Sequence, residues 1–272
     1  MDIFPNARRW YWTATWTITA AWLTVAAQAS DGVDPAAGSP LFEYAARYEV
    51  ERNGRLLGEL AVRLERRDDG LWHYEARSEN PAWFVRLLGL ETVETSWFDW
   101  RDGRVLPLTY HHVSGEPGSD RYWQHRYDWE TGRSETTTHR GALDIPIVEG
   151  VLDPMTLRVA AQAALAGGLR EDLQFLVLER DEVETQAYRF EGSEQLVVDG
   201  RCHDTLRFER FRREGSSRNY TAWHSRRLGW VPVRIRHDDD GDAITMTLSQ
   251  WESDAVPIGS RRPCGEGAGN DS

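Results

Sequence analysis

The sequence predicts an all-β protein with one buried helix, in which an antiparallel meander curls into a half-barrel or spiral β-roll. Three observations lead to this prediction. From Leu41 onward, apolar and polar residues alternate with a period of two, which is typical of half-buried strands. Turn dipeptides such as Asn53-Gly54 separate these runs at short intervals. Only residues 154–166 combine strong helix formers with helix start and stop signals.

The first three strands are predicted between residues 41 and 79. One face of the first strand carries Phe42, Tyr44, Ala46, Tyr48 and Val50. Asn53-Gly54 supplies the positive-φ pair of a tight hairpin, and Asp68-Asp69-Gly70 turns the next strand. The segment Pro81–Leu90 then breaks the alternation with crowded apolar residues, so we expect a short helical or irregular piece. It either plugs one end of the core or forms a mobile apolar lid.

Strands resume at 92–100 and 104–113, followed by a pair at 120–130 and 133–140. The helix comes next. Asp153 is a good N-cap, Pro154 suits the first helical position, and Gly167-Gly168 ends the segment. Its Ala- and Leu-rich composition on almost every face predicts burial against the concave face of the sheet.

The second half of the chain is predicted to be β again, in six strands over 172–180, 184–198, 202–213, 218–225, 231–237 and 243–251. A strand–turn–apolar–Pro–apolar pattern occurs twice, around Pro107 and around Pro232. Proline inside a strand predicts an edge or a bulge at both places.

The termini suggest export. Arg8 and Arg9 precede an uncharged apolar run that ends in Ala27-Gln28-Ala29, the pattern of a secretory signal peptide cut after Ala29. We therefore expect a signal peptide at 1–29, a flexible mature N-terminus at 30–40, a single β-rich domain at 41–252 and a disordered tail at 253–272. The product would be a periplasmic protein with no transmembrane segment in its mature chain.

Composition limits the chemistry. The formal net charge is −12, which disfavours nucleic-acid partners. The chain has no lysine, so Schiff-base mechanisms are excluded. Cys202 and Cys264 are the only cysteines, and in an exported chain they invite a disulfide. The alternative is a buried Cys202 and an incidental Cys264.

Catalytic, metal and cofactor motifs are weak or absent, so we predict no catalytic residues, no metal site and no cofactor. His111 and His112 are adjacent in a strand and point to opposite faces. The acidic run 238–242 lacks the Glu of a calcium loop and is predicted to be a hairpin turn. Nine tryptophans follow residue 29; in strands such residues are core or cross-strand pairs, or they line a binding site.

Three features together resemble a known family: Leu152-Asp153-Pro154-Met155-Thr156-Leu157 leading into a helix, the strand Tyr48-Glu49-Val50 with its Asn53-Gly54 turn, and the pair Trp223…Gly229-Trp230-Val231-Pro232-Val233. The family is the exported proteobacterial group "domain of unknown function 3108", and the resemblance covers roughly Leu41 to Trp251. It implies no catalytic residues, because the family has no established activity. The closing pattern also resembles periplasmic lipoprotein carriers, whose fold is an open half-barrel around a helix.

The leading functional hypothesis is a non-enzymatic periplasmic protein that binds an apolar ligand, an acyl chain or a lipoprotein segment, or that acts in envelope assembly. The ligand would lie between sheet and helix under a lid of Trp83, Phe84, Leu87 and Leu88. One alternative is an envelope glycan or lipid hydrolase, which needs a polar cleft with clustered acids. The other is a structural or partner-binding β domain with a filled interior and an exposed edge.

Overall fold

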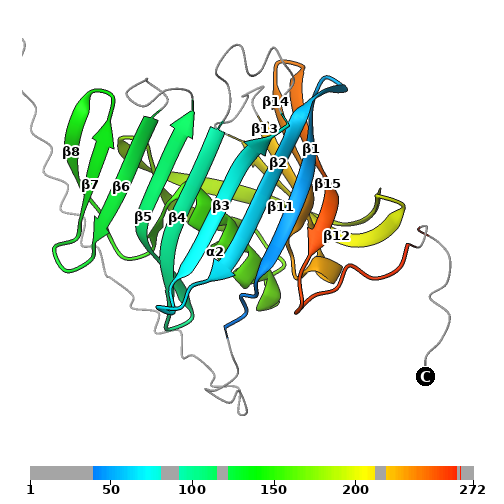
Figure 1. Cartoon of the computed structure of the whole chain (residues 1–272), viewed down its shortest axis with the longest axis horizontal. Coiled ribbons are helices and arrows are strands. Elements are labelled where there is room, and N and C mark those ends of the chain that lie inside the picture. Colours follow the sequence, from blue (N-terminus) through cyan, green and yellow to red (C-terminus); the bar gives the residue numbers. More distant parts are fainter. Residues whose placement is uncertain (1–38, 81–91, 115–121, 212–218, 262–263, 265–272) are drawn as a thin grey trace, which may run out of the picture. The chain divides into compact units, whose positions relative to one another are not determined.

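The strands that come first and last in the sequence lie side by side in the sheet (Figure 1). β1 (Tyr44–Arg52) pairs antiparallel with β15 (Asp242–Glu252), so that Tyr48 lies opposite Leu248. The computed structural model describes residues 39–80, 92–114, 122–211, 219–261 and 264. The expected signal peptide at 1–29 and most of the expected mature N-terminus at 30–40 lie outside these residues.

Fifteen strands form one sheet in the described part of the chain, in the order β8-β7-β6-β5-β4-β3-β2-β1-β15-β14-β13-β12-β11-β10-β9. Strands that follow each other in sequence therefore pair, except β8 and β9, and the β1–β15 pair joins the two halves. The remaining strands are β2 (Arg55–Arg66), β3 (Trp72–Glu79), β4 (Thr92–Arg101), β5 (Arg104–Ser114), β6 (Tyr122–Asp128), β7 (Arg133–Thr138), β8 (Gly141–Pro146), β9 (Val151–Leu152), β10 (Leu173–Glu179), β11 (Glu182–Val198), β12 (Arg201–Phe211), β13 (Asn219–Ser225) and β14 (Pro232–Asp239).

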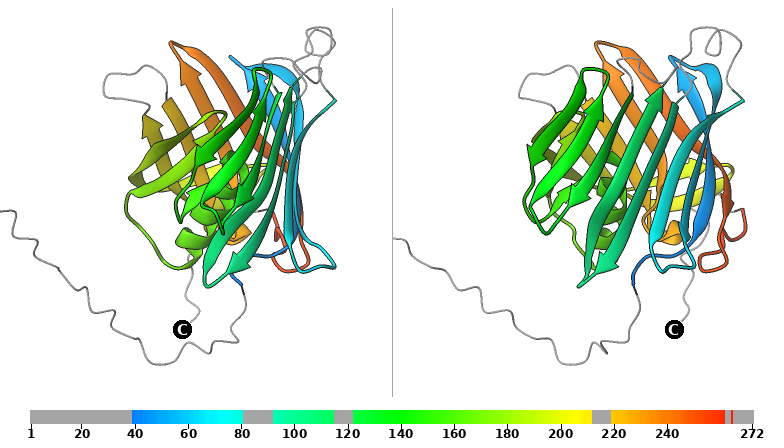
Figure 2. Two further views of the ribbon diagram at one scale, coloured as in Figure 1. Left: turned by 90° about the vertical axis from the view of Figure 1, so that its left-hand side faces the viewer. Right: turned by 60° about the vertical axis from the view of Figure 1, so that its left-hand side comes forward.

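The sheet curls so that its two halves face each other across a helix, and it does not close into a barrel (Figure 2). Its two edges are β8 and β9, which follow each other in sequence but do not pair. The predicted all-β roll with one helix is confirmed. Two details were not predicted. β9 pairs parallel with β10, and β8 is an edge strand whose short, mostly exposed sequence shows no clear alternation.

The helix α2 (Pro154–Ala166) lies inside the curl against β3, β4, β5, β9 and β10. It begins as predicted: Asp153 accepts hydrogen bonds of 2.8 Å from the backbone amides of Met155 and Thr156. Met155, Val159 and Leu165 are buried, and the first two join the main core between the sheet halves. Gly168 follows the helix with φ +96°, a conformation that favours glycine.

Both predicted prolines lie where strand register shifts. In the β4–β5 pair the shift occurs between Trp97 and Phe98, and Phe98 pairs with Pro107. In the β13–β14 pair it occurs between Trp223 and His224, and His224 pairs with Pro232. Proline has no backbone N–H to donate to the neighbouring strand, and a bulge interrupts the regular hydrogen bonding at that point. The two similar sequence patterns therefore form similar local structures in the two halves of the sheet.

The segment that follows β15 packs on the domain as far as the structure describes it. The Trp251 indole donates a hydrogen bond of 2.7 Å to the Val256 carbonyl, and Ile258 packs against the core. Arg261 donates to Asp199 at 2.8 Å. We expected disorder from residue 253 because this stretch is rich in glycine. Contacts to β15 and to the β11–β12 hairpin hold this segment through residue 261. Amino-acid composition does not predict such contacts.

Candidate functional site

An apolar groove runs between α2 and the sheet. Ala160, Ala163, Ala164 and Gly167 recur at helical spacing and form one small-residue side of α2. These small side chains leave a cavity of about 700 Å³ between the helix and the strands opposite. The other apolar residues that line this apolar groove are Pro40, Trp100, Val105, Leu106, Leu152, Ala166 and Phe175.

Charged residues stand at the rim of the apolar groove and not along its walls. The β4–β5 turn contributes Arg101, Asp102 and Arg104, and Arg104 forms an ion pair with Glu149. A cavity of several hundred Å³ with apolar walls and a few polar groups at one place is the usual form of a small-molecule site. The groove can therefore hold an apolar chain whose polar end stays at the rim.

A polar cleft of about 590 Å³ lies at the other end of α2, beside its first turn. Its wall from the first half of the chain holds Glu94, whose carboxylate lies 3.2 Å from Nδ1 of His112 and 3.5 Å from the guanidinium of Arg158. Its wall from the second half holds Glu184, to which Arg210 donates a hydrogen bond of 2.7 Å. Two Arg–Glu pairs thus face each other across the interior of the roll.

The carboxyl groups of the polar cleft differ in their electrostatics. Burial raises the pKa of Glu94, but the His112 hydrogen bond and the Arg158 charge outweigh it and hold that pKa below its usual value. Burial also raises the pKa of Glu179, and here the negative charges of Glu184 and Glu94 raise it further. No hydrogen bond or ion pair to the carboxylate of Glu179 occurs within the described residues.

The aromatic wall of the polar cleft is built by β11, β13 and β14. The rings of Tyr188 and Tyr220 meet edge to face with centroids 5.9 Å apart, and Tyr220 meets His237 at 4.9 Å. His237 is exposed, but desolvation of its ring within the cleft and the nearby Arg158 and Arg210 charges lower its pKa to about 4. The imidazole of His237 is therefore neutral at pH 7.

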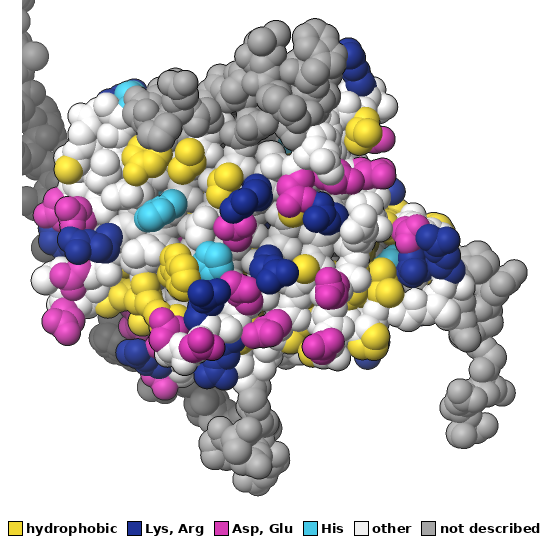
Figure 3. All heavy atoms as spheres, viewed as in Figure 1, with side chains coloured by type: hydrophobic (Ala, Val, Ile, Leu, Met, Phe, Trp, Pro, Cys, Tyr) yellow, Lys and Arg dark blue, Asp and Glu magenta, His cyan; other side chains and the backbone are white. Residues whose placement is uncertain are grey.

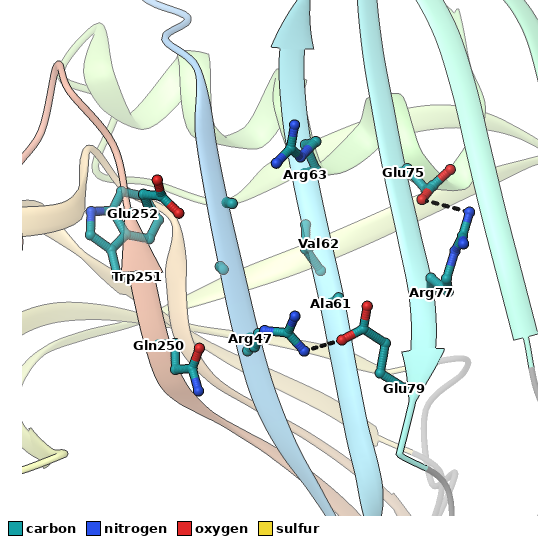
Figure 4. A pocket seen from close by; sticks show the side chains of 12 residues that line it. Arg47, Ala61, Val62, Arg63, Glu75, Arg77, Glu79, Gln250, Trp251 and Glu252 are labelled. Atoms are coloured by element: carbon teal, nitrogen blue, oxygen red, sulfur yellow. Dashed lines mark hydrogen bonds and ion pairs between the residues drawn. The ribbon is translucent and has the colours of Figure 1, made fainter.

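A third hollow, of about 310 Å³, lies on the outer face of β1, β2, β3 and β15 (Figure 4). Small residues such as Ala45 and Ala61 form its floor. Arg47 donates to Glu79, and Arg77 lies 3.0 Å from Glu75. Arginines and acids are interleaved over much of this face (Figure 3). Because these charges neutralise one another at the surface, we do not assign a ligand to this hollow.

The predicted site residues fare differently. The expected lid residues Trp83, Phe84, Leu87 and Leu88 lie outside the described residues. Cys202 and Cys264 are bonded to each other, with Cα atoms 4.9 Å apart. Asp238–Asp242 forms the predicted hairpin turn, in which Asp238 accepts from the Gly241 amide. The described residues contain no cluster of three or more His, Cys, Asp or Glu side chains suited to a metal ion.

Sequence reasoning did not single out Glu94, Glu179, Glu184, Arg158 or Arg210. A signal was present: Glu94 shares its strand face with Ser96 and Phe98, and Arg210 shares its face with Phe208. A charged residue at a strand position that faces inward indicates either a buried ion pair or a polar site. Which strands bring such charges together depends on the curl of the sheet.

The fold and its two interior cavities define the class: an open β-roll wrapped around one helix, with space left beside that helix. The chain belongs to the family described as "Protein of unknown function (DUF3108)", whose model matches residues 43–249. A search of curated proteins found no match to the sequence. In the described part of the chain, no helix has the length and apolar character needed to span a bilayer.

One solved structure supports the fold. The chain is similar to the β-barrel-like protein of domain of unknown function DUF1849 from Brucella abortus, with a TM-score of 0.51, 10% identity, and coverage of 78% of this chain and 98% of that one. Weaker similarities include the MucA/MucB complex of Pseudomonas aeruginosa (TM-score 0.35, 11% identity, 80% and 54% coverage). LprF from Mycobacterium bovis is another (TM-score 0.27, 11% identity, 83% and 92% coverage). This chain spans about half of the matched MucB-complex chain.

Proposed function

We propose that this protein binds a hydrocarbon chain, without catalysis, in the apolar groove beside α2. The observation that carries the proposal is the pairing of a small-residue helix side, at Ala160, Ala163 and Ala164, with the bulky apolar wall of Trp100 and Phe175. A helix inside a packed core normally presents larger side chains, because voids cost stability. A groove of about 700 Å³ that is kept open by alanines favours an exchangeable occupant.

The occupant we propose is an acyl chain, either free or carried on a lipoprotein. The walls of the apolar groove offer dispersion contacts and few hydrogen-bond partners, so they suit a saturated chain. The charged rim at Arg101, Asp102 and Arg104 would remain beside the polar end of the ligand. A role in moving lipid or lipoprotein through the envelope fits this chemistry.

We also propose that the protein works in the periplasm. The signal-like segment 1–29 supports export. The Cys202–Cys264 bond supports it independently, because disulfides persist in oxidising compartments. Comparing the mass of the periplasmic protein with that of the full chain tests the cut after Ala29. A retained N-terminus would contradict this proposal.

The hydrolase alternative required a polar cleft with clustered acids, and such a cleft exists beside the first turn of α2. Its carboxylates at Glu94 and Glu184 are each held by an arginine, which favours positioning over proton transfer. We therefore propose a binding role for the polar cleft as well, and argue it below.

Filling the apolar groove tests the proposed function. We expect Ala163→Leu to weaken binding of palmitate at least tenfold in calorimetric titration, because the added branched side chain occupies the space of the ligand. The matched control is Ala142→Leu, on the exposed edge strand β8, which should bind like the wild type. Unfolding temperatures of both variants show whether the fold is intact. Equal palmitate binding by the folded A163L protein would contradict the proposal.

Native mass spectrometry of the protein isolated from the periplasm without detergent gives a second test. We expect an additional mass in the range of a lipid that disappears after solvent extraction. The same preparation of A163L should carry less of it. A wild-type protein that is free of ligand and also fails to bind palmitate would overturn the assignment of the groove.

A further inference from the structure

We propose that the polar cleft binds the ammonium group of an organic amine, with the carboxylate of Glu179 as its counter-ion. This goes beyond the proposed function, because the polar cleft and the apolar groove lie beside opposite ends of α2. The argument rests on which charges of the cleft are already compensated and which one is not.

Two glutamates on the facing walls, Glu94 and Glu184, each have a cationic partner. Glu94 lies 3.5 Å from Arg158, and Glu184 accepts a hydrogen bond of 2.7 Å from Arg210. Glu179, at the end of β10, also lines the cleft, but its carboxylate has no donor within hydrogen-bond distance among the described residues. A half-buried carboxylate with no donor is costly to leave ionised, and a bound cation removes that cost.

The surroundings of Glu179 favour a cation over an anion. Besides burial, the negative charges of Glu184 and Glu94 raise the pKa of Glu179, and they outweigh Arg210 and His112, which lower it. The neighbouring charges therefore make the local potential at this carboxylate negative. The guanidinium groups of Arg158 and Arg210 are the positive charges in the cleft. Both are engaged by glutamates, which reduces their attraction for an anionic ligand.

The remaining lining favours an organic cation over a metal ion. Tyr188 and Tyr220 present aromatic rings to the cleft, and such rings attract ammonium groups. The described residues offer no group of three ligands of the kind that divalent metals require. A space of about 590 Å³ also exceeds what a bare ion fills, but it suits an amine with a short carbon frame.

Titration with benzylamine and with its neutral isostere benzyl alcohol tests this proposal by NMR chemical-shift changes of the folded protein. We expect saturable binding of benzylamine that is at least tenfold stronger than that of benzyl alcohol. Glu179→Gln should lose that difference, because the amide keeps the shape of the side chain but removes the charge. The matched control is Glu171→Gln, on the exposed segment before β10, which should bind benzylamine like the wild type.

Two further measurements separate the remaining outcomes. The unfolding temperature of E179Q should equal or exceed that of the wild type, since the substitution removes a charge that Glu184 and Glu94 repel. The A163L variant should bind benzylamine normally, so failure of the acyl-chain proposal leaves this one standing. Equal benzylamine binding by folded E179Q and wild type, or displacement of benzylamine by CaCl2 at equal concentration, would overturn the proposal.

Discussion

The hydroxyl of Ser96 donates a hydrogen bond of 2.7 Å to the carboxylate of Asp153, and this contact fastens β4 to the first turn of α2. Both side chains are fully buried. The other oxygen of Asp153 accepts from the Met155 and Thr156 amides, and its own amide donates to the Thr156 hydroxyl. One buried carboxylate therefore determines where α2 starts and how the helix is attached to the sheet. The position of α2 in turn determines the shape of the two cavities that lie beside its ends.

Replacing Asp153 separates its capping role from its charge. Asp153→Ala removes the acceptor for two backbone amides and should lower the free energy of unfolding by about 1–2 kcal/mol. Asp153→Asn keeps an acceptor oxygen and should be far milder at pH 7, because it also removes a buried charge. Urea unfolding of both variants checks the ranking. An Asn variant as unstable as the Ala variant would show that the charge itself is required.

The same residue gives a pH signature. Burial raises the pKa of Asp153 to about 6, against opposing hydrogen bonds. A raised carboxyl pKa means that the folded state takes up the proton more readily than the unfolded chain. The contribution of Asp153 to the free energy of unfolding is thus complete below about pH 4 and is lost as the pH rises through 6. The stability of D153N relative to the wild type should therefore fall as the pH is lowered from 7 to 4.

Buried histidines change the free energy of unfolding with pH in the opposite direction to Asp153, and there are more of them. Burial lowers the pKa of His125 to about 3 and those of His203 and His224 to about 4. These groups stabilise the fold above the unfolded pKa of about 6.5, and this contribution is lost as the pH falls toward 4. We expect the net free energy of unfolding of the wild type to drop between pH 6.5 and 4. Urea titrations at several pH values measure it, and a flat profile would contradict the assignment.

Removing the Cys202–Cys264 bond should lower the free energy of unfolding by about 2–4 kcal/mol. The bond links β12 to the segment beyond β15, across 62 residues of sequence. The double variant Cys202→Ala, Cys264→Ala should fold, because neither cysteine belongs to a hydrophobic core cluster, but residues 253–261 should exchange their amide hydrogens faster. Unchanged exchange in that segment would show that the Trp251–Val256 and Arg261–Asp199 contacts suffice to hold it.

The lid prediction concerns residues outside the described part of the chain and is tested by substitution. Changing Trp83 and Leu87 to Ser should abolish capture of palmitate while the unfolding temperature stays within a few degrees of the wild type. Apolar side chains over a ligand slow its release, so dissociation should accelerate before affinity is lost completely. Unchanged capture would remove the lid hypothesis and leave the apolar groove to act by itself.

Local chemistry made much of the fold predictable. Asn53-Gly54 turns the first hairpin because both residues adopt positive φ, as the sequence required. Pro107 and Pro232 predicted the bulges because proline lacks the amide hydrogen that the ladder needs. The apolar groove was harder to predict from the sequence. An alanine-rich helix predicts burial, but it does not predict that one side of the helix faces a cavity. Glu179 gave no signal, since an acid at a strand end usually faces water.

By itself, the sequence determined the class of fold, the place and cap of the helix, and the turns, because these depend on contacts within a few residues. Tertiary structure alone decided that β1 pairs with β15, that β9 runs parallel to β10, and that Glu94 meets Arg158. The period of two tells which face a side chain occupies, but every antiparallel partner offers the same backbone hydrogen bonds. The choice among partners, and with it the two cavities, follows from burying one shared core around α2.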